Sequence, residues 1–358
     1  MKTFRCLLCI VAFIIVGSNA YGQHKYQKPA LSDPNSWSAI LFPDIQSYVK
    51  FGRNQPILDL MTAWVQENQQ ELNIRSAFFV GDLVDQNDLV DAAPARYNQP
   101  AKQQWEASAR SLSRLDGRIP YFLCTGNHDY SYFDGKKGRS QFKEHFPVDK
   151  NYKTRELLKH VTANSDGIPT MENAAYEFVS PHGVDFLVLS LEFAPRDTVV
   201  AWAKRIVSLP KYGNHTVILL THAYLNAKNE RIVKANYPIE DGNYGEALWE
   251  KLVKPSSNIR LVLCGHVAAP DDWRGHVGFS TDINSAGKKV HQMMFNAQAL
   301  GGGWYGNGGD GWLRIFEFMP DRKTVKVRTF SPFFAISPTT QQYARQTESF
   351  NEFTFSFE

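Results

Sequence analysis

The sequence predicts a layered α/β fold in which two β-sheets pack against each other. Through the first 265 residues, short apolar runs alternate with amphipathic helical patterns, an order typical of layered α/β domains. After Gly265 the pattern changes to short alternating runs at 289–295, 312–318 and 324–330, which we interpret as antiparallel strands. No internal repeat or low-complexity linker interrupts the chain. We therefore expect one domain built from two packed sheets.

The individual elements follow from apolar runs and their spacing. Six apolar runs predict strands at 39–44, 77–82, 120–125, 185–191, 216–222 and 260–265. Residues 56–72 and 102–115 carry apolar side chains three and four apart, which predicts helices. Near the C-terminus, residues 350–357 place Phe353, Phe355 and Phe357 on one face of an extended segment, which predicts an edge strand.

The N-terminal 20 residues have the pattern of a secretory signal peptide. Lys2 and Arg5 precede an apolar run at 6–16, and Ser18 and Ala20 suit a cleavage site after Ala20. The run is shorter than the roughly 18 to 20 residues of a spanning helix, so we expect an exported protein, secreted or periplasmic, with no membrane anchor after cleavage. The predicted organisation is then an extension at 21–36, a main domain at 37–335, and a tail at 336–358 packed on it.

Composition limits the possible partners. With 358 residues and 43% hydrophobic content, the chain can bury a substantial core and is not of the disordered class. Loss of the signal peptide lowers the net charge from +3 to +1, and without a basic run no nucleic-acid platform is expected. Cys124 and Cys264 each end an apolar run, so buried thiols are favoured over a disulfide. Nothing indicates an oligomeric state.

Metal-capable side chains follow five of the predicted strands. In "LFPDIQSY", Asp44 and Gln46 are two residues apart, so on extended backbone they share a face. A single such ending is weak evidence, because a Gly-Asp pair is usually a turn and a lone histidine is usually a surface residue. Ligands in open sheets gather outside the carboxyl ends of the strands. The five endings together predict a metal site formed by Asp44 and Gln46, Asp82 and Asp85, Asn127 and His128, His222, and His266.

The order of these motifs resembles the calcineurin-like metallophosphoesterases. Asp-x-Gln at 44–46, "GDLVD" at 81–85, "GNHD" at 126–129, a histidine after a strand and "GH" at 265–266 are similar to that family's motifs. "GNHD" is the most specific of them. The stretches 296–318 and 327–333 look like the end of secreted bacterial members. The resemblance implies a four-layer α/β sandwich, with two mixed sheets flanked by helices and two adjacent metal ions at one edge.

The resemblance also implies a set of metal ligands. Asp82 would bridge two ions, and one ion would also take Asn127, His222 and His266. The second ion would take Asp44 and Gln46. The family's usual Asp-x-His is Asp-x-Gln here, as in the manganese-dependent ADP-ribose and CDP-alcohol pyrophosphatases. A neutral amide oxygen is harder than imidazole, so manganese or iron is favoured over zinc.

A second departure lies after "GH". The family's second histidine is Ala268 in this sequence, and alanine offers no donor. Water, Asp271, Asp272 or His276 are the candidate substitutes. We therefore expect one tight metal site and one weaker site.

The expected chemistry is attack on phosphorus by a metal-activated hydroxide. His128 would be the general acid, and Asp85 would orient it and hold it protonated, as the resemblance also implies. A structural role for His128 and a turn-forming role for Asp85 are the alternatives.

Substrate contacts are predicted from three side chains. Trp304, in a run with seven glycines between 300 and 311, and Tyr130 are candidate stacking surfaces, with Tyr305 and Tyr132 as neighbours that could serve likewise. Arg274 is a candidate phosphate clamp, because guanidinium binds oxyanions in a fork. Core packing for the tyrosines and a surface ion pair for Arg274 are the alternatives.

These expectations lead to an exported phosphoesterase that acts on small phosphomonoesters or phosphodiesters. Two alternatives stay open: a non-catalytic binding protein on the same fold with a degraded second metal site, and a pyrophosphatase of nucleoside diphosphate conjugates. Gln86 stands where protein serine/threonine phosphatases carry an arginine, which disfavours a phosphoprotein substrate.

Overall fold

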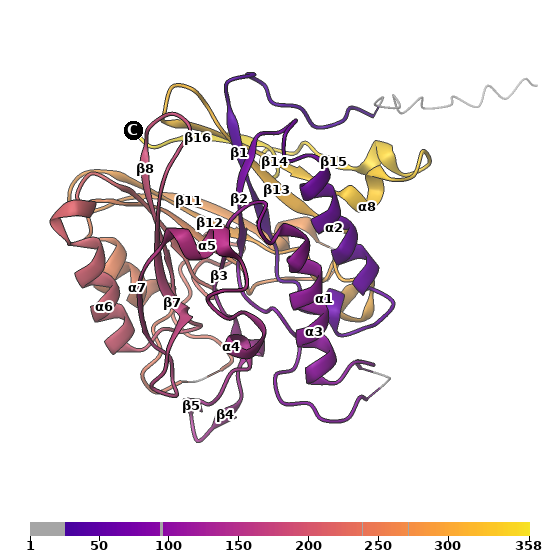
Figure 1. Ribbon diagram of the computed structural model, residues 1–358, viewed down its shortest axis with the longest axis horizontal. Coiled ribbons are helices and arrows are strands. Elements are labelled where there is room, and N and C mark those ends of the chain that lie inside the picture. The colour runs from indigo at the N-terminus through magenta and orange to yellow at the C-terminus, as the bar shows by residue number, and fades with distance from the viewer. Residues whose placement is uncertain (1–25, 94–95, 238, 271) are drawn as a thin grey trace, which may run out of the picture.

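A computed structural model (Figure 1) describes residues 26–93, 96–237, 239–270 and 272–358. Two seven-stranded sheets form its centre, and helices cover their outer faces (Figure 1). The predicted four-layer α/β sandwich is confirmed. The predicted signal peptide at 1–20 lies outside the described residues. Within the described residues, no helix is long and apolar enough to cross a membrane.

The first sheet combines three parallel strands with an antiparallel extension. β1 pairs in parallel with β2, and β2 with β3, while β13 pairs antiparallel with the other side of β1. β14 follows β13, and both β15 and β16 pair with β14. The strands are β15 (Arg345–Gln346), β14 (Thr324–Phe330), β13 (Leu313–Phe318), β1 (Trp37–Phe42), β2 (Ile74–Phe79), β3 (Tyr121–Leu123) and β16 (Phe353–Ser356).

The second sheet has four parallel strands at its centre. β8, β9, β10 and β12 are parallel neighbours, with β11 antiparallel at one edge and β7 and β6 antiparallel at the other. In order, the strands are β11 (Val277–Ile283), β12 (Lys289–Phe295), β10 (Ile259–Cys264), β9 (Thr216–Leu220), β8 (Asp185–Ser190), β7 (Pro169–Val179) and β6 (Leu158–Ala163).

The second sheet corrects one expectation from the sequence. Residues 289–295 were expected to form an antiparallel strand, but β12 runs parallel to β10 and antiparallel only to β11. The chain leaves β10, forms the edge strand β11, and returns as β12 between the two. An alternating pattern shows that one face of a strand is more apolar. It does not show which strands will be its neighbours in the sheet, or whether they run parallel to it.

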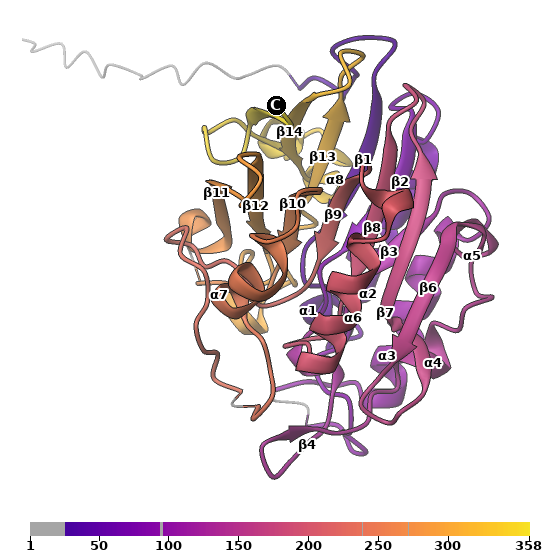
Figure 2. The ribbon, with the colours of Figure 1, turned by 90° about the vertical axis from the view of Figure 1, so that its left-hand side faces the viewer.

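The helices flank the two sheets. α2 (Gln55–Glu67) and α3 (Ala101–Leu112) correspond to the predicted helices, and Figure 1 shows them on one side of the strands, with α6 (Asp197–Val207) on the other. The shorter helices are α1 (Gln46–Val49), α4 (Phe142–His145), α5 (Tyr152–Leu157), α7 (Gly245–Leu248) and α8 (Pro332–Ala335). A small hairpin, β4 (Tyr132–Phe133) with β5 (Lys136–Lys137), extends below the sandwich (Figures 1 and 2). The sequence analysis did not identify α6, β6 or β7.

Alternation along the strands divides the apolar side chains between two layers. In β9, Ile218 and Leu220 belong to the core between the sheets, whereas Val217 and Leu219 pack in the outer cluster with Trp202 of α6. Successive strand side chains point to opposite faces, so a run of five buried or half-buried residues serves both layers. This two-sided burial explains why the central strands read as continuous apolar runs.

The C-terminal strand confirms the prediction from the phenylalanine spacing. β16 pairs with β14, and the rings of Phe353 and Phe355 lie 4.7 and 5.7 Å from the Phe279 ring of β11. The Phe357 ring lies 5.5 Å from that of Phe355. One aromatic face of the tail therefore joins the two sheets.

Candidate metal centre

The predicted site residues meet at one edge of the sandwich because the strands that precede them are parallel. The carboxyl ends of β1, β2 and β3 in one sheet face those of β9, β10 and β12 in the other. A cavity of about 570 Å³ opens there. Its walls are formed by Gln46, Lys50, Asp82, Asp85, Gln86, Arg96, Tyr97, Asn127, His128, Tyr237, His266, Gln298, Trp304 and Tyr305.

Four side chains converge at the floor of this cavity. Ligand atoms of Asp82, His222 and His266 all lie within 4.8 Å of one another. The Asn127 Oδ1 is 3.0 Å from His222 Nε2 and 2.8 Å from His266 Nδ1, and His222 Nε2 is 3.2 Å from Asp82 Oδ2. Neighbouring ligands of an octahedral cation at about 2.1 Å are about 3.0 Å apart. The spacing of these four side chains fits a single cation.

The electrostatics of this group favour a positive charge. Burial alone would disfavour ionised Asp82, but the His222 and His128 rings outweigh it and lower the pKa of Asp82 to about 2. Burial likewise opposes a charged His222, yet Asp82 and Asp44 raise its pKa to about 9. Burial and the neighbouring His222 lower the pKa of His266 to about 3. A cation bound beside His222 and His266 would neutralise the same buried Asp82 carboxylate, because metal ligands bind in their deprotonated form.

Hydrogen bonds to the backbone fix the orientation of the histidine ligands. His222 Nδ1 lies 2.7 Å from the Val80 carbonyl oxygen, and since a carbonyl only accepts, Nδ1 carries a proton and Nε2 faces the cluster. Asp82 and His266 adopt positive φ angles of 48° and 73°. Such backbone strain in non-glycine residues concentrates at functional sites.

The glycines of the motifs make room for the acidic side chains of neighbouring strands. A Cβ on Gly126 would lie 2.7 Å from the Asp82 Cγ, and one on Gly265 would lie 3.1 Å from the Asp44 Cγ. These separations are shorter than the usual 3.5–4.0 Å between carbon atoms in contact. The glycines before Asn127 and His266 are therefore required by side chains that are distant in the sequence.

Asp44 and Gln46 reach the site, but not on extended backbone. β1 ends at Phe42, and Gln46 is the first residue of α1, so the expected shared face of a strand is wrong. Asp44 is buried, and its Oδ2 accepts from the backbone N–H of His266 at 3.0 Å. Gln46 is 3% exposed, and its Oε1 is a buried oxygen without a hydrogen-bond partner. An orphan oxygen on a cavity wall, close to buried carboxylates, suits a cation ligand.

His128 is held at the cavity wall by backbone atoms. Its N–H donates to Asp82 Oδ1 at 2.9 Å, and its Nδ1 lies 2.7 Å from the Asp85 carbonyl oxygen. We expected the Asp85 carboxylate to orient this ring, but the contact is made by the backbone carbonyl. The Asp85 Oδ1 instead lies 3.4 Å from both Lys50 Nζ and Gln46 Nε2.

Two predicted substrate contacts lie away from the cavity. Tyr130 is 4% exposed and its hydroxyl bonds Glu172 and Thr125, so its ring offers no face to a substrate. Arg274 is exposed and stacks 5.1 Å from the centre of the Phe350 ring in the C-terminal segment. Tyr130 follows the alternative of core packing, whereas the stacking of Arg274 on an aromatic ring matches neither the phosphate clamp nor the surface ion pair. Trp304, by contrast, lines the cavity with Tyr305.

Asp272 and His276, which were predicted to replace the ligand that Ala268 cannot supply, also lie away from the cavity. Asp272 is exposed and its Oδ1 accepts from Arg274 N–H at 2.9 Å. His276 is buried, and neither it nor Asp272 is among the residues that line the cavity. Asp271 lies outside the described residues.

Several cavity-facing or supporting residues were not predicted from the sequence, among them Lys50, Arg96, Asn296 and Gln298. Lys50 follows Gln46 by four residues, a spacing that puts both on one face of a helical turn. Asn296 and Gln298 follow β12 as an Asn-x-Gln pair, which repeats the Asp-x-Gln pattern after β1. Arg96 lies in a loop and had no recognisable signal.

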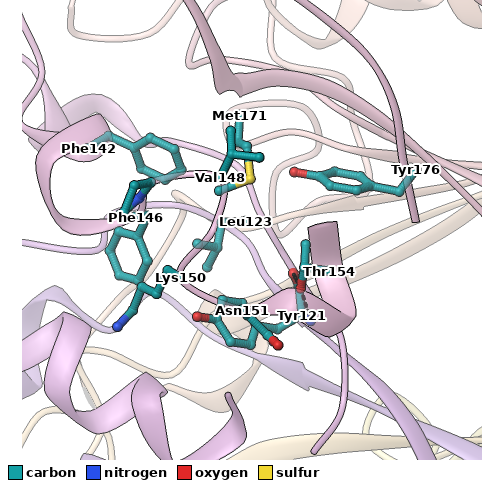
Figure 3. A pocket seen from close by; sticks show the side chains of 11 residues that line it. Tyr121, Leu123, Phe142, Phe146, Val148, Lys150, Asn151, Thr154, Met171 and Tyr176 are labelled. Carbon is teal, nitrogen blue, oxygen red and sulfur yellow. Dashed lines mark hydrogen bonds between the residues drawn. The ribbon is translucent and has the colours of Figure 1, made fainter. Parts of the chain in front are cut away.

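A second hollow in the molecule is unrelated to this site. It lies among β3, α4, α5 and β7, and Figure 3 shows Phe142, Phe146, Val148 and Met171 directed toward its centre. Its volume is about 10 Å³, which is close to the minimum for one water molecule. It is a packing defect of an apolar region.

Comparison with known proteins links the site to a family. The family model described as calcineurin-like phosphoesterase matches residues 40–270. The chain is 30% identical over 285 residues to the uncharacterised protein YvnB of Bacillus subtilis; the match covers 77% of this chain and 18% of that relative, so the chain spans less than a fifth of its length. A solved structure of GAP50, the anchor in the inner membrane complex of Plasmodium, is similar with a TM-score of 0.42 and 12% identity, over 83% of this chain and 85% of that one. That similarity is too low to carry functional information.

Proposed function

The chain belongs to the calcineurin-like phosphoesterase family, and from this premise we propose that it is a metal-dependent hydrolase of small phosphate mono- or diesters. The observation that carries the proposal is the convergence of Asp82, Asn127, His222 and His266 at one point. Asp82, Asn127 and His266 line an open cavity there, and His222 is buried directly behind them. A protein that only binds a partner has no need for metal-ligand side chains buried beside an open cavity, or for a further histidine, His128, on the cavity wall.

The proposed first cation site consists of Asp82, Asn127, His222 and His266, and the second includes Asp44, Gln46 and the shared Asp82. Divalent cations bound there would polarise the phosphoryl oxygens and lower the pKa of a water molecule. The amide oxygens of Gln46 and Asn127 favour manganese or iron over zinc.

His128 is the proposed general acid. Its Nδ1–H donates to the Asp85 carbonyl, which leaves Nε2 as the nitrogen that can transfer a proton to the leaving oxygen. The backbone carbonyl fixes the ring without accepting the proton that is transferred. Asp85 therefore orients His128 through its main-chain carbonyl, and its carboxylate accepts a hydrogen bond from Lys50.

Charged and aromatic groups around the cavity support a phosphate ester as the substrate. Lys50 is 5% exposed, and among the described residues its one carboxylate contact is the 3.4 Å pair with Asp85, so its ammonium can also reach a substrate oxygen. Arg96 lines the same cavity. Trp304 and Tyr305 are 39% and 56% exposed at its rim, and exposed aromatic rings there can hold an aromatic leaving group.

Two cations in the proposed sites would also suit a second candidate, hydrolysis of a pyrophosphate in nucleoside diphosphate conjugates. Such substrates carry two adjacent phosphates and a base. Lys50 and Arg96 could bind the phosphate that is not attacked, while Trp304 or Tyr305 stacks on the base. We further propose that the protein is exported, on the basis of residues 1–20 alone.

Hydrolysis is tested with nitrophenyl phosphate, bis-nitrophenyl phosphate and ADP-ribose, each with added manganese, iron or zinc. Turnover of any of the three that is abolished by EDTA supports the function, and the preferred substrate selects among the candidates. No turnover with any metal would favour a binding protein.

The role of His128 is tested separately. We expect His128→Asn to lower kcat about 10²- to 10⁴-fold, the usual contribution of a general acid, with unchanged metal content. His182→Asn is the matched control, because His182 lies in the turn between β7 and β8, away from the cavity, and its ring bonds the Asn35 carbonyl. Loss of metal in His128→Asn would reassign His128 as a structural residue.

A further inference from the structure

We propose that Gln298 completes the second cation site, in the role for which Ala268 has no donor atom. This inference rests on the two-cation centre of the proposed function. It assigns a ligand from the turn after β12, a strand that follows all the recognised motifs in the sequence.

The fold delivers Gln298 to the cavity. β12 runs parallel to β10, so Asn296 and Gln298 emerge at the same edge as His266. Gln298 is 2% exposed and lines the cavity together with Gln46 and Asp82. Its Nε2 lies 3.3 Å from Asp44 Oδ2, so its side-chain amide adjoins a proposed ligand of the second ion.

The hydrogen bonding of Gln298 is incomplete for a buried amide. Its Nε2 contact with Asp44 is 3.3 Å long, and its Oε1 is 3.4 Å from Ser47 Oγ, whereas strong hydrogen bonds are near 2.9 Å. The Gln46 Oε1 on the same cavity wall has no partner. Two buried, poorly satisfied amide groups line one cavity, Gln298 beside Asp44 and Gln46 beside Asp85. They indicate a common partner that accepts oxygen ligands.

Asn296 has a different role. Its Nδ2 donates to Asp44 Oδ2 at 2.6 Å, and its Oδ1 accepts from the Gln298 N–H at 3.0 Å. Both ends of its amide are therefore used, and it is fully buried. Asn296 positions Asp44 and Gln298, while the Gln298 Oε1 accepts only a long 3.4 Å contact from Ser47 Oγ among the described residues, a contact that an ion can replace.

The resulting second site differs in chemistry from the first. Its donors are oxygens only, from Asp44, Gln46, Asp82 and Gln298, whereas the first site has two imidazoles. Oxygen ligands suit manganese and magnesium, and imidazole also suits zinc. We expect zinc to fill the first site alone and manganese to fill both.

The experiment counts ions and measures affinities without reference to turnover. Metal-free wild type, Gln298→Ala and Gln298→Glu are titrated with Mn²⁺ by calorimetry, and spin-coupled manganese pairs are detected by electron paramagnetic resonance. Gln292→Ala is the matched control: Gln292 is a fully buried glutamine within β12, the strand that precedes Gln298, and its amide bonds Ser280 and Asp282 instead.

We expect two ions in wild type, Gln292→Ala and Gln298→Glu. In Gln298→Ala the second ion should bind at least tenfold more weakly, with loss of the spin-coupled signal and an unchanged first affinity. The carboxylate of Gln298→Glu preserves an oxygen ligand, so this variant should retain the second ion if Gln298 is a ligand. If Gln298 were only a structural residue, Gln298→Glu would not restore binding of the second ion.

Three results would overturn the inference: unchanged binding of both ions by Gln298→Ala, loss of both ions in that variant, or a single ion in wild type. Failure of the proposed function is a separate result. A protein that binds two manganese ions in a manner dependent on Gln298, but hydrolyses none of the three substrates, would retain this inference and lose the function.

Discussion

Substitution of Gly126 by alanine should disable the metal centre, although the change adds only a methyl group. The new Cβ would stand 2.7 Å from Asp82 Cγ, whereas carbon atoms in contact keep about 3.5–4.0 Å. Asp82 or the "GNHD" loop must then move by about 1 Å. Metal ligands tolerate shifts of only about 0.2 Å, and overpacking of this kind costs about 1–3 kcal/mol of the free energy of unfolding.

We therefore expect Gly126→Ala to bind its first manganese ion at least 100-fold more weakly and to unfold at lower urea concentration. Calorimetric titration with Mn²⁺ measures the first effect, and urea unfolding of the metal-free protein measures the second. Gly213→Ala is the control. Gly213 ends the short helix Pro210–Tyr212 before β9, and the nearest atom that its new Cβ would meet among the described residues is the Pro210 carbonyl oxygen, at 3.3 Å. Wild-type manganese affinity in Gly126→Ala would refute the argument from close packing.

Three further predictions concern the substrate, acid stability and the metal. Lys50→Met should raise KM and the inhibition constant for inorganic phosphate about tenfold with unchanged metal content; an equal KM would remove Lys50 from the binding site. Burial would raise the pKa of Glu192, but Lys137 and Arg196 outweigh it and lower that pKa to about 2, so this carboxylate's stabilisation is complete above pH 4.5 and is lost as the pH falls through about 2. Its size is about 3 kcal/mol, and urea unfolding of the metal-free protein between pH 2.5 and 6 should show a slope that Glu192→Gln reduces. Removal of metal by EDTA should lower the Tm, and manganese at about 100 times its Kd should restore about 2.7 kcal/mol of stability; a Tm insensitive to manganese would contradict a site formed only in the folded state.

Much of the candidate metal site could be predicted from short segments of the sequence. Asp82, Asn127, His222 and His266 each follow an apolar run directly, so the edge of the sheet on which they emerge depends on the strand direction alone. Their grouping was therefore predictable once those strands were taken as parallel. The layered α/β class was predictable for a similar reason, because strand and helix periods are properties of short segments.

Proximity in sequence was misleading where a side chain could turn to either side. Tyr130 is only two residues beyond His128, yet it points into the core, where Glu172 and Thr125 bind its hydroxyl. Arg274 packs on Phe350, a residue from the far end of the chain. Neither neighbour is visible in the local pattern.

The sequence by itself determined which residues could bind a metal, because ligand chemistry and position after a strand are local properties. Only the tertiary structure decided that β12 inserts parallel to β10 and brings Gln298 beside Asp44, and that Lys50 faces Asp85. The physical reason is that strand order is set by pairing and burial between distant segments, and the same alternating pattern of apolar residues satisfies a parallel and an antiparallel neighbour equally well.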